Sequence, residues 1–249
     1  MEGNPFFEKN AEKYALSQSH KKGEDLDILE RLLKPGRNEV VLDVGTGTGF
    51  TAVRMAPLVR SVTASDPTEG MLNQARKIAE ESGVTNIRFL KSSWEHLDPE
   101  EGRYDIITCR RAAHHFHNME GFFSKIYSLL NPGGRFGFVD FTTPEEDIHD
   151  FFNGLERTRD STHVYALKVS EIERLSKKNG FSLTALETRE ERVSFLSWLY
   201  PVEENSGEGV KCREYLEGSP IEKAKLINYD PVDRTFTKTR VIAILQKSG

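Results

Sequence analysis

Histidines occur in two segments of the sequence where an imidazole could accept a proton. The segment RRAAHHFHN supplies His114, His115 and His117 directly after an apolar run, and RDSTH supplies His163. The unperturbed pKa of histidine is about 6.5, which suits a general base at neutral pH. We therefore predict His163 and His115 as catalytic residues. The alternative for the adjacent pair is structural, with one or both rings packing against or capping the following helix.

The same two segments allow other interpretations. His114 and His117 are spaced as they would be on one face of a helix, which would suit a metal site. No cysteine or carboxylate adjoins them to complete such a site, so no metal is predicted. In RDSTH, Arg159 and Asp160 would alternatively form an ion pair that holds a helical segment together, with His163 on the surface.

A glycine-rich loop, GTGTG, follows the apolar run EVVLDV. A P-loop would end in Gly-Lys-Ser/Thr, whereas Phe50 and Thr51 follow the last glycine here. A dinucleotide-binding loop reads G-x-G-x-x-G/A, and here the third glycine comes one residue early. Either the loop brings its backbone close to a ligand or it is only a tight turn. The loop residues predicted to contact a ligand are Gly45, Thr46, Gly47 and Gly49.

A carboxylate precedes this loop and favours a cationic ligand. Asp43 is two residues before the first glycine, where its charge would repel a pyrophosphate and attract a cation. No lysine or arginine occurs between Val40 and Val53 to offset that charge. S-adenosylmethionine carries a sulfonium and an ammonium group but no phosphate, so it satisfies this condition.

A second carboxylate, Asp66, ends the next apolar run. At that position a carboxylate can accept hydrogen bonds from both hydroxyls of a ribose. The alternative is that Asp66 only caps the turn that begins at Pro67, because Asp-Pro is a common start of turns.

Strand and helix patterns alternate from residue 39 to residue 142. Short apolar runs at 39–44, 61–66, 86–92, 104–110 and 135–142 indicate strands, and segments of helical period lie between them. This alternation predicts a doubly wound parallel sheet, in which ligands lie outside the carboxyl ends of the strands. The glycine loop, Asp66 and the first histidine segment all follow such ends.

The remaining segments extend the sheet or surround it. Residues 1–36 are predicted to form an N-terminal helical cap, 181–188 a sixth strand and 234–247 a long last strand. Helical segments at 144–178 and 190–230 are expected to be lid or acceptor-side insertions, within a single domain spanning residues 1–249. The segment FLSWLY contains the apolar residues Phe195, Trp198, Leu199 and Tyr200. They either line the acceptor side or form the core of this lobe, and we favour the core.

Composition excludes several functional classes. The net charge of −5, with acidic clusters such as PEEDIHD and ETREE, disfavours nucleic acid and anionic membranes as partners. Two cysteines are too few for a disulfide framework. The sequence contains no apolar stretch of about 20 residues that could span a membrane. The charged N-terminus does not resemble a secretory signal, so a cytoplasmic location is expected.

Five segments, in this order and spacing, resemble class I S-adenosylmethionine-dependent methyltransferases. They are VVLDVGTGTG, SDPTEGML, YDIITCRRAAHHF, LLNPGGRFGFVDF and FNGLERTRDSTHVYALKVSEIERLSKKNGF. They are most similar to the branch that includes the ubiquinone/menaquinone biosynthesis C-methyltransferases, over about residues 10 to 190. The resemblance implies a seven-stranded sheet in the order 3-2-1-4-5-7-6, with residues 234–247 as an antiparallel last strand.

The resemblance also implies roles for individual residues. Gly45 and Gly47 would lie against the methionine part of the cofactor, and Asp66 would hold the ribose. Similar proteins often carry an acidic residue beside the adenine, where this chain has Ser93 and Trp94. A serine hydroxyl can accept a hydrogen bond and a tryptophan can stack on the ring; the alternative for Trp94 is a place in the core. The predicted cofactor-binding residues are Asp43, Gly45, Thr46, Gly47, Gly49, Asp66, Pro67, Met71, Ser93, Trp94, Cys109 and Arg110.

The sequence thus predicts an S-adenosylmethionine-dependent methyltransferase that yields S-adenosylhomocysteine. Its acceptor is expected to be a small molecule, such as a quinol-like or other apolar ring, methylated on carbon or oxygen. Arg110 or Arg111 would pair with an acidic group of a substrate or serve the structure. One alternative is a nicotinamide-dependent oxidoreductase, which Asp43 and Phe50 disfavour. Another is a non-catalytic S-adenosylmethionine-binding protein, which the unusual Ser93 leaves open.

Overall fold

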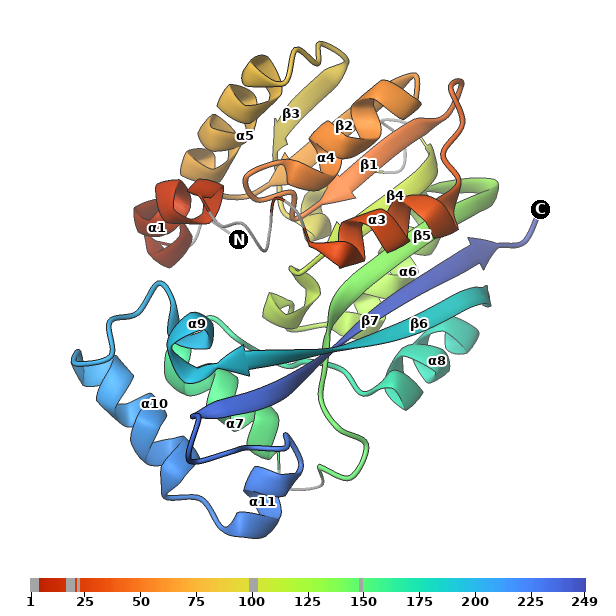
Figure 1. The fold of residues 1–249 in the computed structure, drawn as a ribbon. Coiled ribbons are helices and arrows are strands. Elements are labelled where there is room, and N and C mark those ends of the chain that lie inside the picture. Colours follow the sequence, from red (N-terminus) through yellow and green to blue (C-terminus); the bar gives the residue numbers. More distant parts are fainter. Residues whose placement is uncertain (1–4, 17–20, 22, 99–102, 148–149) are drawn as a thin grey trace.

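The computed structural model describes residues 5–16, 21, 23–98, 103–147 and 150–249 of the chain. Its centre is a seven-stranded sheet in the order β3-β2-β1-β4-β5-β7-β6 (Figure 1). The first five strands run parallel, and β7 is antiparallel to both of its neighbours. This arrangement confirms the predicted fold. The strands are β1 (Val40–Val44), β2 (Ser61–Asp66), β3 (Ile87–Lys91), β4 (Tyr104–Arg110), β5 (Leu130–Thr142), β6 (Phe181–Ser194) and β7 (Thr235–Lys247).

Helices cover both faces of this sheet, so its central strands are buried on both sides. Neighbouring residues of β1 enter different cores: Val41 packs with Leu29 and Met55, whereas Leu42 packs with Phe122. A strand buried on both faces reads as a continuous apolar run, which is why the pattern EVVLDV identified β1. The helices are α1 (Pro5–Leu16), α3 (Glu24–Leu33), α4 (Phe50–Met55), α5 (Glu69–Glu81), α6 (Met119–Leu129), α7 (Phe151–Arg159), α8 (Val169–Lys178), α9 (Phe195–Leu199), α10 (Gly207–Glu217) and α11 (Ile221–Lys225).

The last two strands extend beyond the sheet as a two-stranded ribbon. Pairing of β5 with β7 ends at Thr142 and Thr239, but β6 stays paired with β7 as far as Ser194 and Thr235. The predicted sixth strand ended at residue 188, and the segment that begins at residue 190 was expected to be helical or loop-like. That expectation was wrong for residues 190–194, because TREERVS carries no apolar pattern and becomes a strand only through its pairing with β7.

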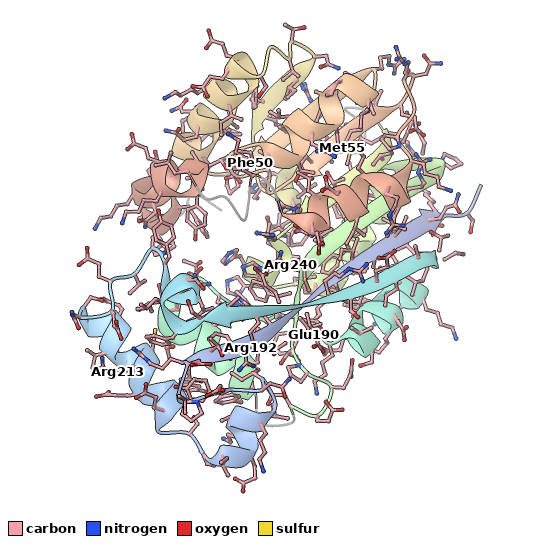
Figure 2. All side chains as sticks on the ribbon, viewed as in Figure 1. Phe50, Met55, Glu190, Arg192, Arg213 and Arg240 are labelled. Carbon is pink, nitrogen blue, oxygen red and sulfur yellow. The ribbon has the colours of Figure 1, made fainter. Side chains whose placement is uncertain are left out.

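A helical lobe packs around this ribbon, below the sheet in Figure 1. Its apolar core joins Phe151, Phe152 and Leu155 of α7 to residues of α9, α10 and β7. Three of the four residues predicted as core belong to it: Phe195, Trp198 and Leu199. Tyr200 does not, because it is half-exposed, and together with Trp198 it lines a cavity described below. In Figure 2, Arg240 of β7 lies at the level where the sheet and the lobe meet.

Helix α8 is not part of the lobe, although residues 144–178 were predicted as an insertion. Ile172 and Leu175 pack in the same apolar cluster as Phe181 of β6 and Phe123 of α6. The helix therefore covers the sheet, and only α7 of the predicted segment lies in the lobe. The N-terminal helix α1 packs on α5, where Glu8 accepts a hydrogen bond from the backbone N–H of Gly70 at 3.0 Å.

Candidate active site

The glycine loop lies between β1 and α4 and has glycines where other residues would not fit. Gly47 and Gly49 have φ values of 54° and 84°, a left-handed conformation that glycine adopts without strain. A Cβ on Gly49 would lie 2.8 Å from the Cβ of Ala75, so this glycine allows the loop to approach α5. A Cβ on Gly47 would meet nothing within 4 Å. Gly47 therefore presents its backbone to open space.

Asp66, at the end of β2, holds this loop in position. Its Oδ2 accepts a hydrogen bond from the backbone N–H of Gly47, and its Oδ1 accepts one from that of Thr68, both at 2.9 Å. The second bond is the turn cap that was the alternative interpretation of Asp66. The carboxylate also lines the neighbouring cavity, and each oxygen has a second lone pair that can accept a further hydrogen bond.

Asp43 lies behind the loop, and its carboxylate does not face the cavity as we had expected. It accepts hydrogen bonds from the hydroxyls of Thr46 at 2.6 Å and Thr108 at 2.7 Å. Burial raises the pKa of Asp43 to about 6. Asp43 pairs with Thr108 of β4 in the register of the sheet, so the two side chains lie next to each other on one face. The visible role of Asp43 is to anchor Thr46.

A cavity of 640 Å³ opens at the carboxyl ends of β1, β2 and β4. Its volume is in the range of cofactor sites, which is about 300–1,000 Å³. Helix α1 and the segment from Ser161 to Val164 complete its walls. The predicted cofactor-binding residues that line it are Gly45, Thr46, Gly47, Asp66, Pro67, Met71 and Arg110.

The other predicted cofactor-binding residues are buried elsewhere. Trp94 packs against Phe116 and Phe122, with ring centroids 6.0 and 5.6 Å away, which supports its interpretation as a core residue. The hydroxyl of Ser93 lies 3.1 Å from Nδ1 of His96. The residues of the prediction that do not line the cavity are Asp43, Gly49, Ser93, Trp94 and Cys109.

Two arginines at the end of β4 share one carboxylate from α3. Arg110 and Arg111 each donate two hydrogen bonds of 2.9–3.0 Å to Asp25, and Arg240 approaches it at 3.6 Å. Burial alone would raise the pKa of Asp25, but Arg111 and Arg110 lower it well below its usual value. These ion pairs serve the structure, since they attach α3 to the edge of the site.

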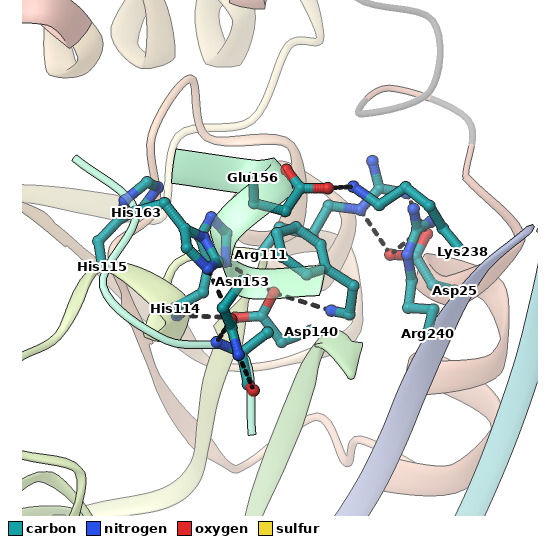
Figure 3. Close-up of polar contacts among 12 residues, drawn as sticks. Asp25, Arg111, His114, His115, Asp140, Asn153, Glu156, His163, Lys238 and Arg240 are labelled. Carbon is teal, nitrogen blue, oxygen red and sulfur yellow. Dashed lines mark hydrogen bonds and ion pairs between the residues drawn. The ribbon is translucent and has the colours of Figure 1, made fainter. Parts of the chain in front are cut away.

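Three histidine rings lie together beside the cavity (Figure 3). The ring centroid of His114 is 4.0 Å from that of His115 and 5.5 Å from that of His163. His163 is buried and lines the cavity, so the interpretation that placed it on the surface was wrong. The alternative ion pair of Arg159 with Asp160 was also wrong, because Arg159 pairs with Glu156 at 2.9 Å.

Each of the three rings is held by an acceptor that cannot donate. Nδ1 of His114 lies 2.8 Å from Oδ1 of Asp140. Nδ1 of His115 lies 3.0 Å from the carbonyl oxygen of Thr162. Nε2 of His163 lies 2.8 Å from Oδ1 of Asn153. The Asn153 oxygen also accepts from a backbone N–H, which identifies it as the oxygen. The contacting nitrogen must therefore carry the proton, and in the neutral form of each ring the other nitrogen keeps a lone pair.

The surroundings of the three rings differ in charge. Burial and the proximity of His114 lower the pKa of His163 to about 3 and that of His115 to about 4. Both rings are therefore neutral and weakly basic. His114 differs because its partner is a buried carboxylate, and a carboxylate stabilises an imidazolium as it forms. Asp140 is fixed in turn by the backbone N–H groups of His114 and Phe141.

A second cavity of 650 Å³ lies between the first and the lobe. Its walls contain His114, Phe141 and Trp198, together with charged residues of β6, β7 and α7. The two cavities share four lining residues and so adjoin at one place. The shared residues are Phe7, Tyr14, Arg111 and His115.

Sequence reasoning missed several residues of this region. Asp140 lies near the end of the predicted fifth strand, so its position at the ligand edge was a usable signal. The others come from segments whose packing could not be read from a local pattern. The missed residues are Phe7, Asp25, Asp140, Asn153, Lys238 and Arg240.

Two further observations concern the described part of the chain alone. Within it, no cluster of three or more His, Cys, Asp or Glu side chains is placed to hold a metal ion. None of its helices is long and apolar enough to cross a membrane.

The sheet order, the glycine loop and the carboxylate at the end of β2 define a methyltransferase. A family profile described as a methyltransferase domain matches residues 41–134. YcgJ of Bacillus subtilis (strain 168), an uncharacterized methyltransferase, is 34% identical over 194 residues, which are 78% of this chain and 77% of that protein. The chain therefore belongs to the class I S-adenosylmethionine-dependent methyltransferases.

Solved structures and a further relative extend this comparison. A protein from Bacillus halodurans C-125 superposes with a TM-score of 0.84 at 30% identity, covering 91% of this chain and 100% of that one. The structure of YcgJ superposes with a TM-score of 0.82 at 27% identity, covering 90% and 98%. The ubiquinone biosynthesis O-methyltransferase of Shewanella halifaxensis (strain HAW-EB4) is 35% identical over 112 residues, which are 45% of this chain and 46% of that protein.

Proposed function

We propose that this methyltransferase transfers the methyl group of S-adenosylmethionine to a small-molecule acceptor bound in the second cavity. The observation that carries the proposal is the junction of the two cavities at Phe7, Tyr14, Arg111 and His115. Methyl transfer needs donor and acceptor in line and in contact, and such alignment is worth about 7–11 kcal/mol in favourable systems. Two adjoining cavities of similar volume meet that requirement.

The residues of the first cavity fit this cofactor. Asp66 would accept the ribose hydroxyls through its remaining lone pairs, as the prediction states. Gly45 and Gly47 would lie against the methionine part, since Gly47 presents its backbone to open space. Met71 and Pro67 would supply apolar contacts for the adenine. When bound, the cofactor supplies an activated methyl group, so the protein needs only to orient and to move a proton.

A neutral acceptor oxygen or carbon must also lose a proton, and we assign this step to His114. Its Nδ1–H donates to Asp140, which leaves Nε2 as the proton acceptor in a residue that lines the second cavity. The predicted bases, His115 and His163, also line the site, but their lowered pKa values make them weak bases. We propose that His115 positions the acceptor at the junction and that His163 holds the segment from Ser161 to Val164 through Asn153.

Segments that surround the two cavities would close over them. Phe7 and Tyr14 of α1 line both cavities, as a cap formed by the N-terminal residues would require. The lobe covers the acceptor side, and the segment from Ser161 to Val164 covers the cofactor side. We therefore keep the proposal of a single domain with an N-terminal cap and a lobe that acts as a lid.

The acceptor is proposed to contain an apolar ring. Phe141, Trp198 and Phe7 line the second cavity and offer faces on which a ring can stack. Relatives are named as methyltransferases of ubiquinone and menaquinone biosynthesis, which agrees with a quinol-like ring. Methylation on either oxygen or carbon fits the arrangement of His114.

An activity screen with labelled S-adenosylmethionine tests this function. Quinols, phenols and other small aromatic molecules would be incubated with the chain, and transfer of label to each would be measured. We expect transfer to at least one acceptor, together with formation of S-adenosylhomocysteine. Binding of S-adenosylhomocysteine without transfer to any acceptor would favour the non-catalytic alternative, and binding of NAD in its place would favour the oxidoreductase.

A further inference from the structure

The second cavity has more cationic than acidic side chains in its walls. The cationic side chains that line it are Arg111, Arg159, Lys238 and Arg240. Figure 3 shows the last two side by side on β7. The acidic side chains that line it are Asp160 and Glu191. The four cationic side chains are all less than a fifth exposed.

The carboxylates behind these cations are shared. Glu156 is fully buried and pairs with both Lys238, at 2.7 Å, and Arg159, at 2.9 Å. Asp25 likewise serves Arg110 and Arg111, and lies only 3.6 Å from Arg240.

The charge of Arg111 is the most poorly compensated. Burial, followed by the proximity of Arg240 and Arg110, lowers the pKa of Arg111 to about 9 despite its pairing with Asp25. Asp25 therefore compensates the charge of Arg111 only in part. An additional negative charge in the cavity would be stabilised.

Two guanidinium groups in the wall also have unused donors. Arg240 donates through Nη2 to Glu191 at 3.0 Å, and Arg159 donates through Nη2 to Glu156 at 2.9 Å. Within the described part of the chain, Nε of each of these two side chains is buried and has no hydrogen-bond acceptor. Nη1 of Arg240 makes only the long contact with Asp25. A ligand with acidic oxygens would fill this deficit of acceptors.

Aromatic faces adjoin the same donors. The ammonium of Lys238 lies 4.0 Å from the ring centroid of Phe141, and the guanidinium of Arg159 lies 5.5 Å from that of Trp198. Phe141 is also 4.3 Å from His114, the residue assigned as base. An acceptor ring bound near Phe141 would thus lie close to both Lys238 and the imidazole of His114.

We propose that the methyl acceptor is an aromatic carboxylic acid, with its carboxylate bound by Arg240 and Arg159 and its ring held between the aromatic side chains of the second cavity. This inference rests on the proposed function, because it assumes that the second cavity is the acceptor site. It adds the acidic group, which the choice of an apolar ring alone does not supply. Arg240 serves as the main counter-ion, because its partner Glu191 is half-exposed and the carboxylate of a ligand can take its place.

Matched pairs of acids and amides test the proposal. Benzoate with benzamide, cinnamate with cinnamamide, and indole acetate with indole acetamide would each be titrated into the full chain saturated with S-adenosylhomocysteine. Calorimetry or ligand-observed NMR would report the affinities. We expect at least one acid to bind about tenfold more tightly than its amide, because a hydrogen bond to a charged group is worth about 1.5–3 kcal/mol. If no acid in the panel binds more tightly than its amide, the proposal is wrong.

Three variants locate the preference. Arg240→Gln should abolish the preference for the acid, whereas Arg174→Gln, on the exposed side of α8, should leave it unchanged. Glu191→Gln should strengthen binding of the acid, because Arg240 loses its competing carboxylate. That variant alters a half-exposed side chain, so it remains a usable test if Arg240→Gln does not fold. A preference that survives in Arg240→Gln, or that Glu191→Gln does not increase, would contradict the assignment of Arg240.

The same titrations separate this inference from the proposed function. Failure of the chain to bind S-adenosylhomocysteine would contradict the cofactor assignment itself. Normal binding of S-adenosylhomocysteine with equal affinity for acids and amides would leave the cofactor site standing and reject only the acidic acceptor.

Discussion

Asp140 accepts a hydrogen bond of 2.8 Å from Nδ1 of His114, and this pair connects the end of β5 to the turn after β4. Asp140 is buried and also accepts hydrogen bonds from the backbone N–H groups of His114 and Phe141. These contacts leave the carboxylate no freedom to rotate, so it fixes both the tautomer and the orientation of the imidazole. The pair is therefore the part of the site best suited to accept a proton.

Replacement of His114 by Gln should lower turnover on the order of a hundredfold, which is the lower range for loss of a general base. Turnover by the wild type should rise with pH, because a general base acts only in its unprotonated form, and this rise should disappear in the variant. The affinity for S-adenosylhomocysteine should not change, because His114 lines only the second cavity. Steady-state rates across a range of pH on an acceptor found in the screen provide the measurement.

His163→Gln is the matched comparison for this test. The pKa of His163 is lowered to about 3, so it should not contribute to the rise of activity near neutral pH. If the rise of activity with pH were lost in His163→Gln and kept in His114→Gln, His163 would be the base in place of His114.

Asp66→Ala should weaken binding of S-adenosylhomocysteine by about a hundredfold, because two hydrogen bonds from the ribose to a charged group are lost. The variant should remain folded, since the loop keeps its other bond from the N–H of Thr46 to the carbonyl of Ser65. Isothermal calorimetry measures the affinity, and Asp233→Ala in an exposed turn serves as the control. A near-wild-type affinity of Asp66→Ala for S-adenosylhomocysteine would contradict the assignment of Asp66 to the ribose.

S-adenosylhomocysteine should raise the melting temperature by about 5–10 °C at a hundredfold excess over its Kd, given the size of the chain. NAD at the same concentration should leave it unchanged, because the loop lacks the third-glycine position of a dinucleotide site. A thermal-shift measurement with both ligands provides the comparison. A shift with NAD and none with S-adenosylhomocysteine would favour the oxidoreductase over the methyltransferase.

Asp25→Asn should destabilise the protein by about 3–5 kcal/mol at neutral pH, because Arg110 and Arg111 lose the charge that compensates them while buried. The folded-state pKa of Asp25 is lowered, so its contribution is present above the unfolded-state pKa of about 4 and is lost as pH falls toward the folded-state value. The difference in unfolding free energy between wild type and variant should therefore shrink in acid.

Urea unfolding at several pH values measures this difference. Asp27→Asn, at an exposed position of the same helix, should change stability by about 1 kcal/mol or less. An effect of Asp25→Asn as small as that of Asp27→Asn would show that the buried ion pairs do not hold α3 to the site.

Local patterns in the sequence predicted the strands of the sheet well where both faces are buried. β2 and β4 occupy residues 61–66 and 104–110, as expected from their apolar runs. The cap of α6 was also predictable, because Asn118 accepts a hydrogen bond from the N–H of Gly121 at 2.8 Å. Residues 190–194 of β6 were not predictable, since a polar strand paired with a single neighbour carries no such pattern.

Side-chain direction at the strand ends was harder to predict than strand position. Asp43 and Asp66 both end apolar runs, but Asp66 faces the cavity and Asp43 turns toward β4. Trp94 follows β3, where a cofactor contact was expected, and packs into the core beside Phe122 instead. These directions depend on the pleat and on neighbouring strands, which a single segment does not contain.

By itself the sequence determined the order of strands and helices, the glycine loop and the carboxylate at the end of the second strand, because period, turn chemistry and spacing are local properties of the chain. The tertiary structure alone decided that Arg110 pairs with Asp25 across 85 positions of sequence, that Asp140 orients His114, and that Arg240 and Arg159 face the same cavity. Such contacts join segments that meet only when the sheet and the lobe pack together. For that reason the methyl donor could be recognised before the fold was known, whereas the side chains around the proposed acceptor site come together only in the folded protein.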